Sequence, residues 1–286
     1  MSAPAVWTAE DTEDVRCCLC GIPGTLVHDV SPFGVVRCPR CDLVFISPRL
    51  RPEALQRLYD DAGYFEGGVY GSAVSSADEG GTASAAGGRF SPAMVLQKTW
   101  TAGRLRLIEQ TLGGAPTGGR LLEVGSGYGL FLAAARDAGW TTSGVELSRT
   151  GAGHAQGTLG LDVFCGQLED APLRPGFDVV VAWDTVEHVP DPLAFWRTVR
   201  SLVADDGVVL FSTPYVSSLP ARLLGTRWWT LKPTEHIWHF TPRTHALVAA
   251  RAGLALTRVI RSPLAPANAG RLDSLVGIAR PIPQSS

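Results

Sequence analysis

The sequence predicts an α/β fold in which a doubly wound, mostly parallel, Rossmann-like sheet of seven strands lies between layers of helices. Short runs rich in valine and leucine alternate with helical segments from residue 91 onward. Three of these helical segments begin with a capping residue followed by proline, at Ser91-Pro92, Asp191-Pro192 and Thr241-Pro242. Strands that alternate with helices in this way form parallel sheets covered on both faces.

Seven runs have the length and composition of buried strands. They are residues 120–124, 141–145, 161–164, 177–182, 207–212, 254–260 and 274–279. The first proline-headed helix extends to about Leu112, and the third ends at Gly253, because glycine commonly follows the last turn of a helix.

The composition indicates a globular protein that is large enough for one catalytic domain and a small appendage. The chain has 286 residues, of which 45% are hydrophobic and 18% charged. Its formal charge of −2 provides no general field for phosphate backbones, so nucleic acid is not an expected partner. No apolar run approaches the ~18–20 residues of a membrane span, and the first residues are acidic where a signal peptide would be basic. We therefore expect a cytoplasmic protein without a membrane span.

Four of the cysteines have the spacing of zinc ligands. In a reducing compartment, cysteines are more often thiols or metal ligands than disulfides. Cys17-x-x-Cys20 and Cys38-x-x-Cys41 are separated by 17 residues, and two such pairs can surround one Zn²⁺ with a tetrahedron of thiolates. A site with four cysteine ligands has no open position for chemistry, so we expect a structural role.

These features divide the chain into four segments. Residues 1–14 form a polar tail, and residues 15–50 form the zinc knuckle. Residues 51–90 combine a short helix with a linker or lid rich in glycine, serine and alanine, which predicts flexibility. Residues 91–286 form the catalytic domain.

A glycine-rich loop follows the first strand of this domain. The strand leads into Glu123-x-Gly125-x-Gly127-x-Gly129 and then into a helix. The glycines let a ligand lie against the backbone, and the helix N-terminus faces that ligand. The next strand ends in Glu146, 21 residues after Gly125, where a carboxylate can bind both hydroxyls of a ribose. The glycine spacing differs from the G-x-G-x-x-G of dinucleotide-binding proteins.

The loop resembles the first motif of the class I S-adenosylmethionine (SAM)-dependent methyltransferases, (D/E)-x-G-x-G-x-G. The resemblance follows that family's order over residues 120–215 and implies its seven-stranded fold, with SAM as cofactor. It also implies that Glu123 and the loop from Gly125 through Ser126 and Gly127 to Gly129 hold the methionine part, and that Glu146 holds the ribose.

The remaining predicted cofactor contacts follow other strands of the sheet. By the same resemblance, Gln167 meets the adenine amine and the backbone of Leu168 bonds the ring. The family more often has an aspartate at the position of Gln167, but an amide oxygen can also accept a hydrogen bond from the amine. Leu147 and Trp183, at the ends of the second and fourth strands, complete the predicted site.

The fourth strand places candidate catalytic residues beyond its carboxyl end, where ligands of doubly wound sheets bind. They are Asp184, Glu187 and His188, which share one face if the segment turns helically. An imidazole titrates near neutral pH and could take the proton of an attacking hydroxyl. The alternative is a structural histidine that holds the loop.

The same segment is similar to that of the ubiquinone-pathway O-methyltransferases, in which an acid precedes Glu-His-Val-Pro-Asp-Pro. In that family the acids and the histidine are associated with a divalent metal. The resemblance therefore implies one further hypothesis, that Asp184, Glu187 and His188 weakly hold a divalent cation, Mg²⁺ or Mn²⁺.

Aromatic and basic residues after the fifth strand form a candidate wall for the acceptor substrate. They include Trp228, Trp229 and Lys232, followed by His236 and His239, which could face one pocket. Zinc-knuckle methyltransferases of bacterial sugar, envelope and natural-product pathways have a similar Glu-His segment here, which favours a functional His236. Packing of the aromatic rings on the core is the alternative.

Taken together, the residues and the resemblance predict an enzyme that methylates an oxygen of a small molecule. The reaction would belong to a bacterial sugar, envelope or natural-product pathway. Asp184, His188 and His236 are the candidate catalytic residues. One alternative is C-methylation of a nucleotide sugar. A second is methylation of an rRNA base with the zinc module reading RNA, against which the charge argues. A third is a non-catalytic protein that binds SAM.

Overall fold

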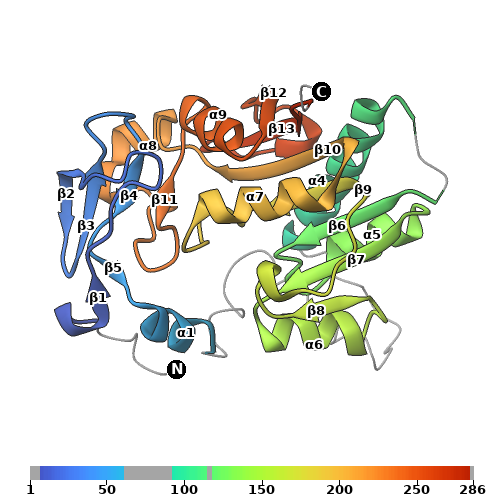
Figure 1. The fold of residues 1–286 in the computed structure, drawn as a ribbon, viewed down its shortest axis with the longest axis horizontal. Coiled ribbons are helices and arrows are strands. Elements are labelled where there is room, and N and C mark those ends of the chain that lie inside the picture. The colour runs from blue at the N-terminus through green and yellow to red at the C-terminus, as the bar shows by residue number, and fades with distance from the viewer. Residues whose placement is uncertain (1–6, 61–91, 115–117, 284–286) are drawn as a thin grey trace.

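The computed structural model describes residues 7–60, 92–114 and 118–283, which form one large sheet with its helices and a smaller N-terminal module (Figure 1). Most of the predicted flexible linker lies outside the described residues. No helix in the described part of the chain is long and apolar enough to cross a membrane.

The large sheet has seven strands in the order β12-β13-β10-β9-β6-β7-β8. Neighbouring strands from β10 to β8 are parallel, whereas β13 is antiparallel to both β10 and β12. The predicted doubly wound, mostly parallel sheet is therefore confirmed. The strands are β6 (Arg120–Val124), β7 (Thr141–Glu146), β8 (Val163–Cys165), β9 (Phe177–Trp183), β10 (Val203–Pro214), β12 (Leu254–Ile260) and β13 (Ser274–Pro281).

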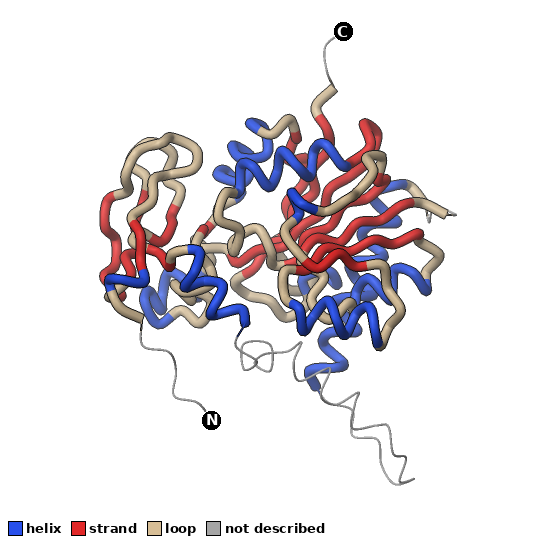
Figure 2. Tube along the Cα trace, turned by 60° about the horizontal axis from the view of Figure 1, so that its bottom comes forward, coloured by secondary structure: helices blue, strands red, loops and turns tan. Residues whose placement is uncertain are grey.

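Helices cover both faces of this sheet (Figure 2). Successive strand residues point to opposite faces, so that Leu121 and Val179 belong to one buried cluster and Leu122 and Val180 to the other. The first cluster contains side chains of α4 (Pro92–Leu112), α5 (Leu130–Asp137) and α6 (Arg149–Gly157), and the second contains side chains of α7 (Pro192–Leu202) and α9 (Pro242–Arg251).

The proline-headed helices begin where the sequence predicts. The Asp191 carboxylate accepts hydrogen bonds from the backbone of Leu193 and Ala194 at 2.9 and 3.0 Å, which satisfies two of the free N–H groups at the start of α7. Thr241 caps α9 in the same way. Segment 184–188 differs from the helical expectation, because it forms only a turn after β9.

The N-terminal module contains a second sheet of four strands in the order β11-β4-β3-β2. Three of them come from the cysteine-containing segment: β2 (Thr25–Val30), β3 (Phe33–Arg37) and β4 (Val44–Ile46). The fourth, β11 (Trp238–His239), comes from the aromatic segment after β10 and lies beside β4 (Figure 1). Phe45 and Trp238 stack at 5.5 Å between ring centroids, so the two parts of the chain share one buried core.

Shorter elements complete the described structure. Strands β1 (Thr12–Glu13) and β5 (Arg49–Leu50) form a two-stranded ribbon before α1 (Pro52–Asp60). Helix α8 (Leu219–Leu224) follows β10. Single 3₁₀ turns occur at Ala9–Asp11, Leu168–Asp170, Gly225–Arg227 and Pro266–Asn268.

Candidate functional site

The glycine-rich loop has a backbone that side chains would distort. Gly125, Gly127 and Gly129 all have positive φ angles, of 74°, 53° and 80°, a region that glycine enters without steric cost. A Cβ at Gly125 would lie 2.6 Å from the Thr185 hydroxyl, whereas a Cβ at Gly127 would meet nothing within 4 Å. The loop therefore packs against the turn after β9 on one side and borders open space at Gly127.

Glu146 lies at the end of β7 and is bonded to this loop. Its Oε2 accepts from the backbone N–H of Gly127 at 2.6 Å, and its Oε1 accepts from that of Ser148 at 2.7 Å. Burial raises the pKa of the Glu146 carboxyl, while the Ser148 and Gly127 amides lower it. Each carboxylate oxygen can accept a further hydrogen bond, so Glu146 can hold the glycine loop and still receive two ribose hydroxyls.

Polar atoms around the loop fit a polar cofactor. Among the described residues, Glu123 Oε2, Ser126 Oγ and Trp183 Nε1 are buried without a hydrogen-bond partner. Buried polar groups are normally paired, so these atoms mark where a ligand would bond. Burial raises the pKa of Glu123 well above its ordinary value, which favours the protonated carboxyl, a group that can donate a hydrogen bond to a ligand.

The other predicted cofactor residues lie at the ends of the neighbouring strands. Leu147 and Gln167 are exposed after β7 and β8, and Leu168 is buried at the start of a 3₁₀ turn. Residues at the carboxyl ends of adjacent parallel strands share one edge of the sheet. Leu147, Gln167 and Leu168 therefore lie at the edge of the sheet where ligands of this fold bind, and their contacts to the ribose and adenine of SAM stay a prediction.

Asp184 has a different environment from the one expected of a proton acceptor. Both of its carboxylate oxygens accept hydrogen bonds from the Arg271 guanidinium, each at 2.7 Å. Arg104 lies 3.6 Å away. Although burial alone would raise its pKa, these two arginines and Ser212 lower the pKa of Asp184 to about 2. The residue has a φ of 51°, so the ion pair holds an unfavourable backbone conformation at the end of β9.

Glu187, His188 and His236 form a cluster in which Glu187 and His236 are buried and His188 is half-buried. One ligand atom from each lies within 4.8 Å of the others, and the two imidazole rings meet edge to face with centroids 4.7 Å apart. Within the described structure, neither oxygen of Glu187 has a hydrogen-bond partner, and neither does His188 Nδ1. Burial lowers the pKa of both histidines and raises that of Glu187. The lowered pKa favours the neutral form of both rings, in which one nitrogen keeps its lone pair.

His239 is not part of this cluster. Its side chain is 1% exposed and packs near Trp228, with ring centroids 5.9 Å apart. Trp228 is also buried, whereas Trp229 is 55% exposed. His236 nevertheless lies near His239, because burial and then the His236 ring lower the pKa of His239 to about 3. That the two histidines face one pocket stays a prediction.

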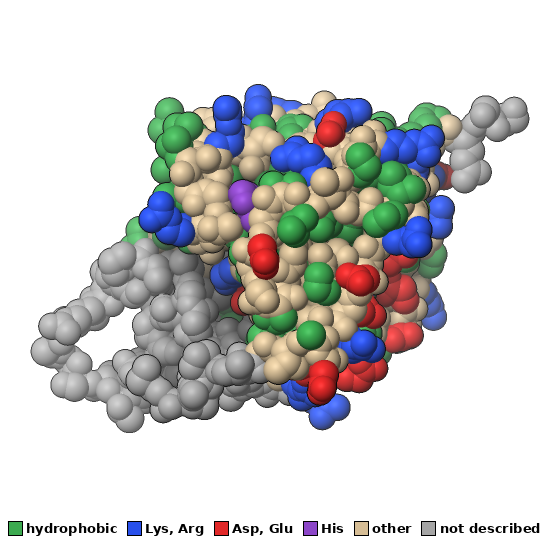
Figure 3. Space-filling view, turned by 90° about the vertical axis from the view of Figure 1, so that its left-hand side faces the viewer, with side chains coloured by type: hydrophobic (Ala, Val, Ile, Leu, Met, Phe, Trp, Pro, Cys, Tyr) green, Lys and Arg blue, Asp and Glu red, His purple; other side chains and the backbone are tan. Residues whose placement is uncertain are grey.

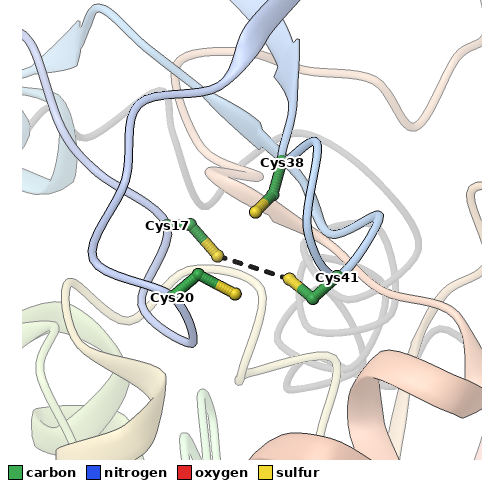
Figure 4. A group of neighbouring side chains, drawn as sticks. All are labelled: Cys17, Cys20, Cys38 and Cys41. Carbon is green, nitrogen blue, oxygen red and sulfur yellow. Dashed lines mark hydrogen bonds between the residues drawn. The ribbon is translucent and has the colours of Figure 1, made fainter.

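The four predicted zinc ligands converge in the N-terminal module (Figure 4). Their sulfur atoms all lie within 4.8 Å of one another, and the Cys17 and Cys41 sulfurs are 3.5 Å apart. A tetrahedron with Zn–S bonds of about 2.3 Å has sulfurs separated by roughly 3.8 Å. Burial raises the pKa of Cys17 to about 11, a cost for the thiolate that a bound cation offsets. The four residues thus fit Zn²⁺, and Cys18 and Cys165 lie outside the cluster.

The cysteine-containing segment is connected to the turn that bears Glu187. Strand β4 pairs with β11, and the Ile46 amide donates to the Ile237 carbonyl at 3.0 Å. The amides of Ile237 and Trp238 in turn donate to the Glu187 carbonyl at 2.9 and 3.2 Å. The cysteine centre therefore supports the strand that follows His236.

The comparisons with known proteins agree with this geometry. A family model described as a methyltransferase domain matches residues 96–259. The chain belongs to this methyltransferase family. The match includes the glycine loop, Glu146 and the His188 and His236 segments, so the predicted relationship to the class I SAM-dependent methyltransferases is confirmed.

Curated relatives match this methyltransferase domain over part of their length. The chain is 32% identical over 137 residues to the ubiquinone biosynthesis O-methyltransferase of Actinobacillus pleuropneumoniae serotype 5b, which covers 44% of this chain and 56% of that protein. It is 36% identical over 138 residues to the enzyme of the same name from Neisseria meningitidis serogroup A, covering 45% and 56%. The chain thus spans about half the length of these relatives.

A solved structure shares the fold of the methyltransferase domain. The SAM-dependent methyltransferase from Clostridium acetobutylicum superposes with a TM-score of 0.51, at 11% identity, over 65% of this chain and 92% of that one. At this identity the likeness concerns the fold alone, and it agrees with the seven-stranded sheet described above.

Sequence reasoning missed the residues that hold the site together from the C-terminal segment. Arg271 binds Asp184, and Asp273 binds the Trp228 indole and the Thr230 hydroxyl. These residues precede β13 in a short irregular segment without a motif. The sequence offered one indication of their role, which is that Arg271 and Asp273 are charged residues directly before a predicted buried strand.

We expect Glu146→Ala to weaken SAM binding by at least ~2 kcal/mol, or roughly 30-fold, because the variant loses the ribose acceptor in a partly dry site. Gly127→Val should weaken it as well, since its side chain would enter the open space beside the loop. Isothermal titration calorimetry measures both effects, with the exposed Glu53→Ala on α1 as control. Unchanged affinity in Glu146→Ala and Gly127→Val would contradict the cofactor site.

Proposed function

We propose that this protein transfers the methyl group of SAM to an oxygen of a small-molecule acceptor. The observation that carries the proposal is the contact between the glycine loop and the turn bearing His188. The Thr185 hydroxyl donates to the Val124 carbonyl at 3.1 Å, and Gly125 approaches Thr185 closely. A cofactor on the glycine loop and an acceptor beside His188 would therefore be neighbours.

SAM supplies an activated methyl group when it is bound, so the protein has mainly to align the acceptor and remove its proton. Glu123, Ser126 and Glu146 would hold the cofactor. His188 or His236 would accept the proton of the acceptor hydroxyl, because burial lowers the pKa of both rings and so favours the neutral form, which has a free lone pair. Asp184 would act as a structural anchor, since its carboxylate is ionised and bound to Arg271.

The names of the relatives favour oxygen as the methylated atom, because both are O-methyltransferases. The zinc-binding segment favours a biosynthetic sugar, envelope or natural-product pathway, with C-methylation of a nucleotide sugar as the alternative. RNA is a poorer acceptor candidate. Basic and acidic side chains are interspersed over the visible described part of the N-terminal face (Figure 3), whereas tight RNA binding needs a basic surface.

The test uses the purified protein, SAM with a radiolabelled methyl group, and a bacterial cell extract separated into small-molecule and RNA fractions. We expect label in the small-molecule fraction, in a product whose mass spectrum shows an O-methyl group. Label only in RNA would favour the rRNA alternative. Binding of SAM without transfer to either fraction would favour a non-catalytic protein.

A divalent cation at Glu187, His188 and His236 is a second candidate for the chemistry of this cluster. One carboxylate and two imidazoles are a ligand set that suits transition metals better than Mg²⁺. The predicted participation of Asp184 in a Mg²⁺ site does not fit the structure, because Arg271 binds both carboxylate oxygens. Running the same transfer assay with and without added Mg²⁺ or Mn²⁺ distinguishes a cation from a base mechanism.

A further inference from the structure

The short segment before β13 contacts both halves of the candidate acceptor site. Arg271 binds Asp184, which begins the turn bearing His188. Asp273 is 7% exposed and binds the segment that bears His236. The next residue, Ser274, donates its hydroxyl to the Thr213 carbonyl of β10 at 2.9 Å, so the segment is fixed to the central sheet.

Asp273 holds the loop that precedes His236. Its Oδ2 accepts a hydrogen bond from Trp228 Nε1 at 2.8 Å and another from the Thr230 hydroxyl. Both donors converge on one oxygen of the buried Asp273 side chain, and a buried polar group that loses its hydrogen-bond partner destabilises the local structure. Asp273 therefore restrains Thr230 through the hydroxyl of that residue.

The Thr230 carbonyl contacts the ring of His236, with 2.7 Å between the oxygen and Nδ1. A carbonyl can only accept, so Nδ1 must carry the hydrogen. In the neutral ring, Nε2 is then left with its lone pair. Nε2 is the nitrogen that is available whether the ring takes a proton or binds a cation.

We propose that Asp273 is a positioning residue that acts through Thr230 to keep His236 in the Nδ1–H tautomer, with Nε2 free for the acceptor. The inference rests on the proposed function for its catalytic consequence, but the tautomer itself depends only on contacts within the chain. The same logic operates where a carboxylate or carbonyl orients a catalytic or metal-binding histidine.

The first test is the tautomer. Protein labelled with ¹⁵N-histidine gives signals from six histidines, and His236→Ala identifies the signal of His236 in long-range ¹H–¹⁵N spectra. We expect the Nδ1–H form in the wild-type protein and a mixture with the Nε2–H form in Asp273→Asn. Asp206→Asn is the matched control, because Asp206 is exposed and lies in the part of β10 that precedes its pairing with β13. This variant should leave the signal unchanged.

A second variant protects the test against misfolding. Thr230→Val keeps the shape of the side chain and the backbone carbonyl but removes the hydroxyl that binds Asp273, so it should change the tautomer in the same direction. A wild-type His236 in the Nε2–H form would overturn the proposal, and so would an unchanged tautomer in both Asp273→Asn and Thr230→Val.

The catalytic consequence is measured with the small-molecule fraction that accepts the labelled methyl group. Asp273→Asn should lower the transfer rate by about tenfold or more, as loss of a histidine's orienting partner does in other sites, with SAM affinity retained. In a His236→Ala background it should have no further effect. If Asp273→Asn lowers the transfer rate equally in the wild-type and His236→Ala backgrounds, Asp273 does not act through His236. Because the tautomer needs neither SAM nor acceptor, failure of the proposed function alone would leave the tautomer result intact.

Discussion

Replacing Cys38 by serine should remove zinc from the protein and disorder the strand that follows His236. We expect about one equivalent of zinc in the wild-type protein and almost none in the variant. The loss should spread because Cys38 directly follows β3, which pairs with β4, and β4 pairs with β11. Metal analysis measures the zinc, and hydrogen exchange measures protection of the Ile237 and Trp238 amides, whose acceptor is the Glu187 carbonyl.

The control for this prediction is Cys165→Ser, since Cys165 is exposed at the end of β8 and outside the cysteine cluster. It should retain both the zinc and the exchange protection. SAM affinity should change little in Cys38→Ser, because Glu146 and the glycine loop lie on strands of the other sheet. Protein prepared without chelator that contains no zinc would show that the cysteine centre has been misassigned.

The second large effect is expected at the buried histidines. If His188 accepts the proton of the acceptor, His188→Ala should lower turnover by ~10² or more while SAM affinity stays nearly unchanged, because the lost interaction belongs to the transition state. If His236 is the base, its alanine variant should show the larger loss. Turnover of the small-molecule fraction and calorimetry with SAM measure the two quantities separately.

His28→Ala is the matched control, because His28 lies on β2 of the N-terminal sheet, away from the cluster. It should behave as the wild-type protein. If His188→Ala and His236→Ala each retain more than about a third of the wild-type turnover, the loss is far smaller than general-base catalysis provides. Alignment of the acceptor would then drive the reaction, and both histidines would be structural.

The parts of the site predicted from sequence are those that depend on short stretches of chain. The glycine spacing requires a backbone with positive φ at Gly125, Gly127 and Gly129, and the structure has it. The capping pairs at Asp191 and Thr241 satisfy helix N–H groups within three residues. Such interactions are visible in a sequence because both partners lie within one turn or one strand–loop unit.

The interactions that escaped prediction join residues far apart in the chain. Arg271 and Asp184 are separated by 87 positions and Asp273 and Trp228 by 45. Many carboxylates could in principle pair with a given arginine, and only the packing of the sheet selects one. The ion pair of Asp184 was not predicted, because it becomes evident only when β9 and the segment before β13 are brought together.

The sequence by itself determined the doubly wound sheet, the glycine loop with its acidic partner Glu146, and the four cysteines that converge on one centre. Periodicity, glycine conformation and ligand spacing are local properties, and they suffice for these features. Only the tertiary structure decided that β11 joins the cysteine-containing sheet, that His236 rather than His239 meets His188, and that Asp273 binds Thr230, whose carbonyl contacts His236. The physical reason is that burial selects these long-range partners: a polar group removed from water must bond to whichever group the folded chain places beside it.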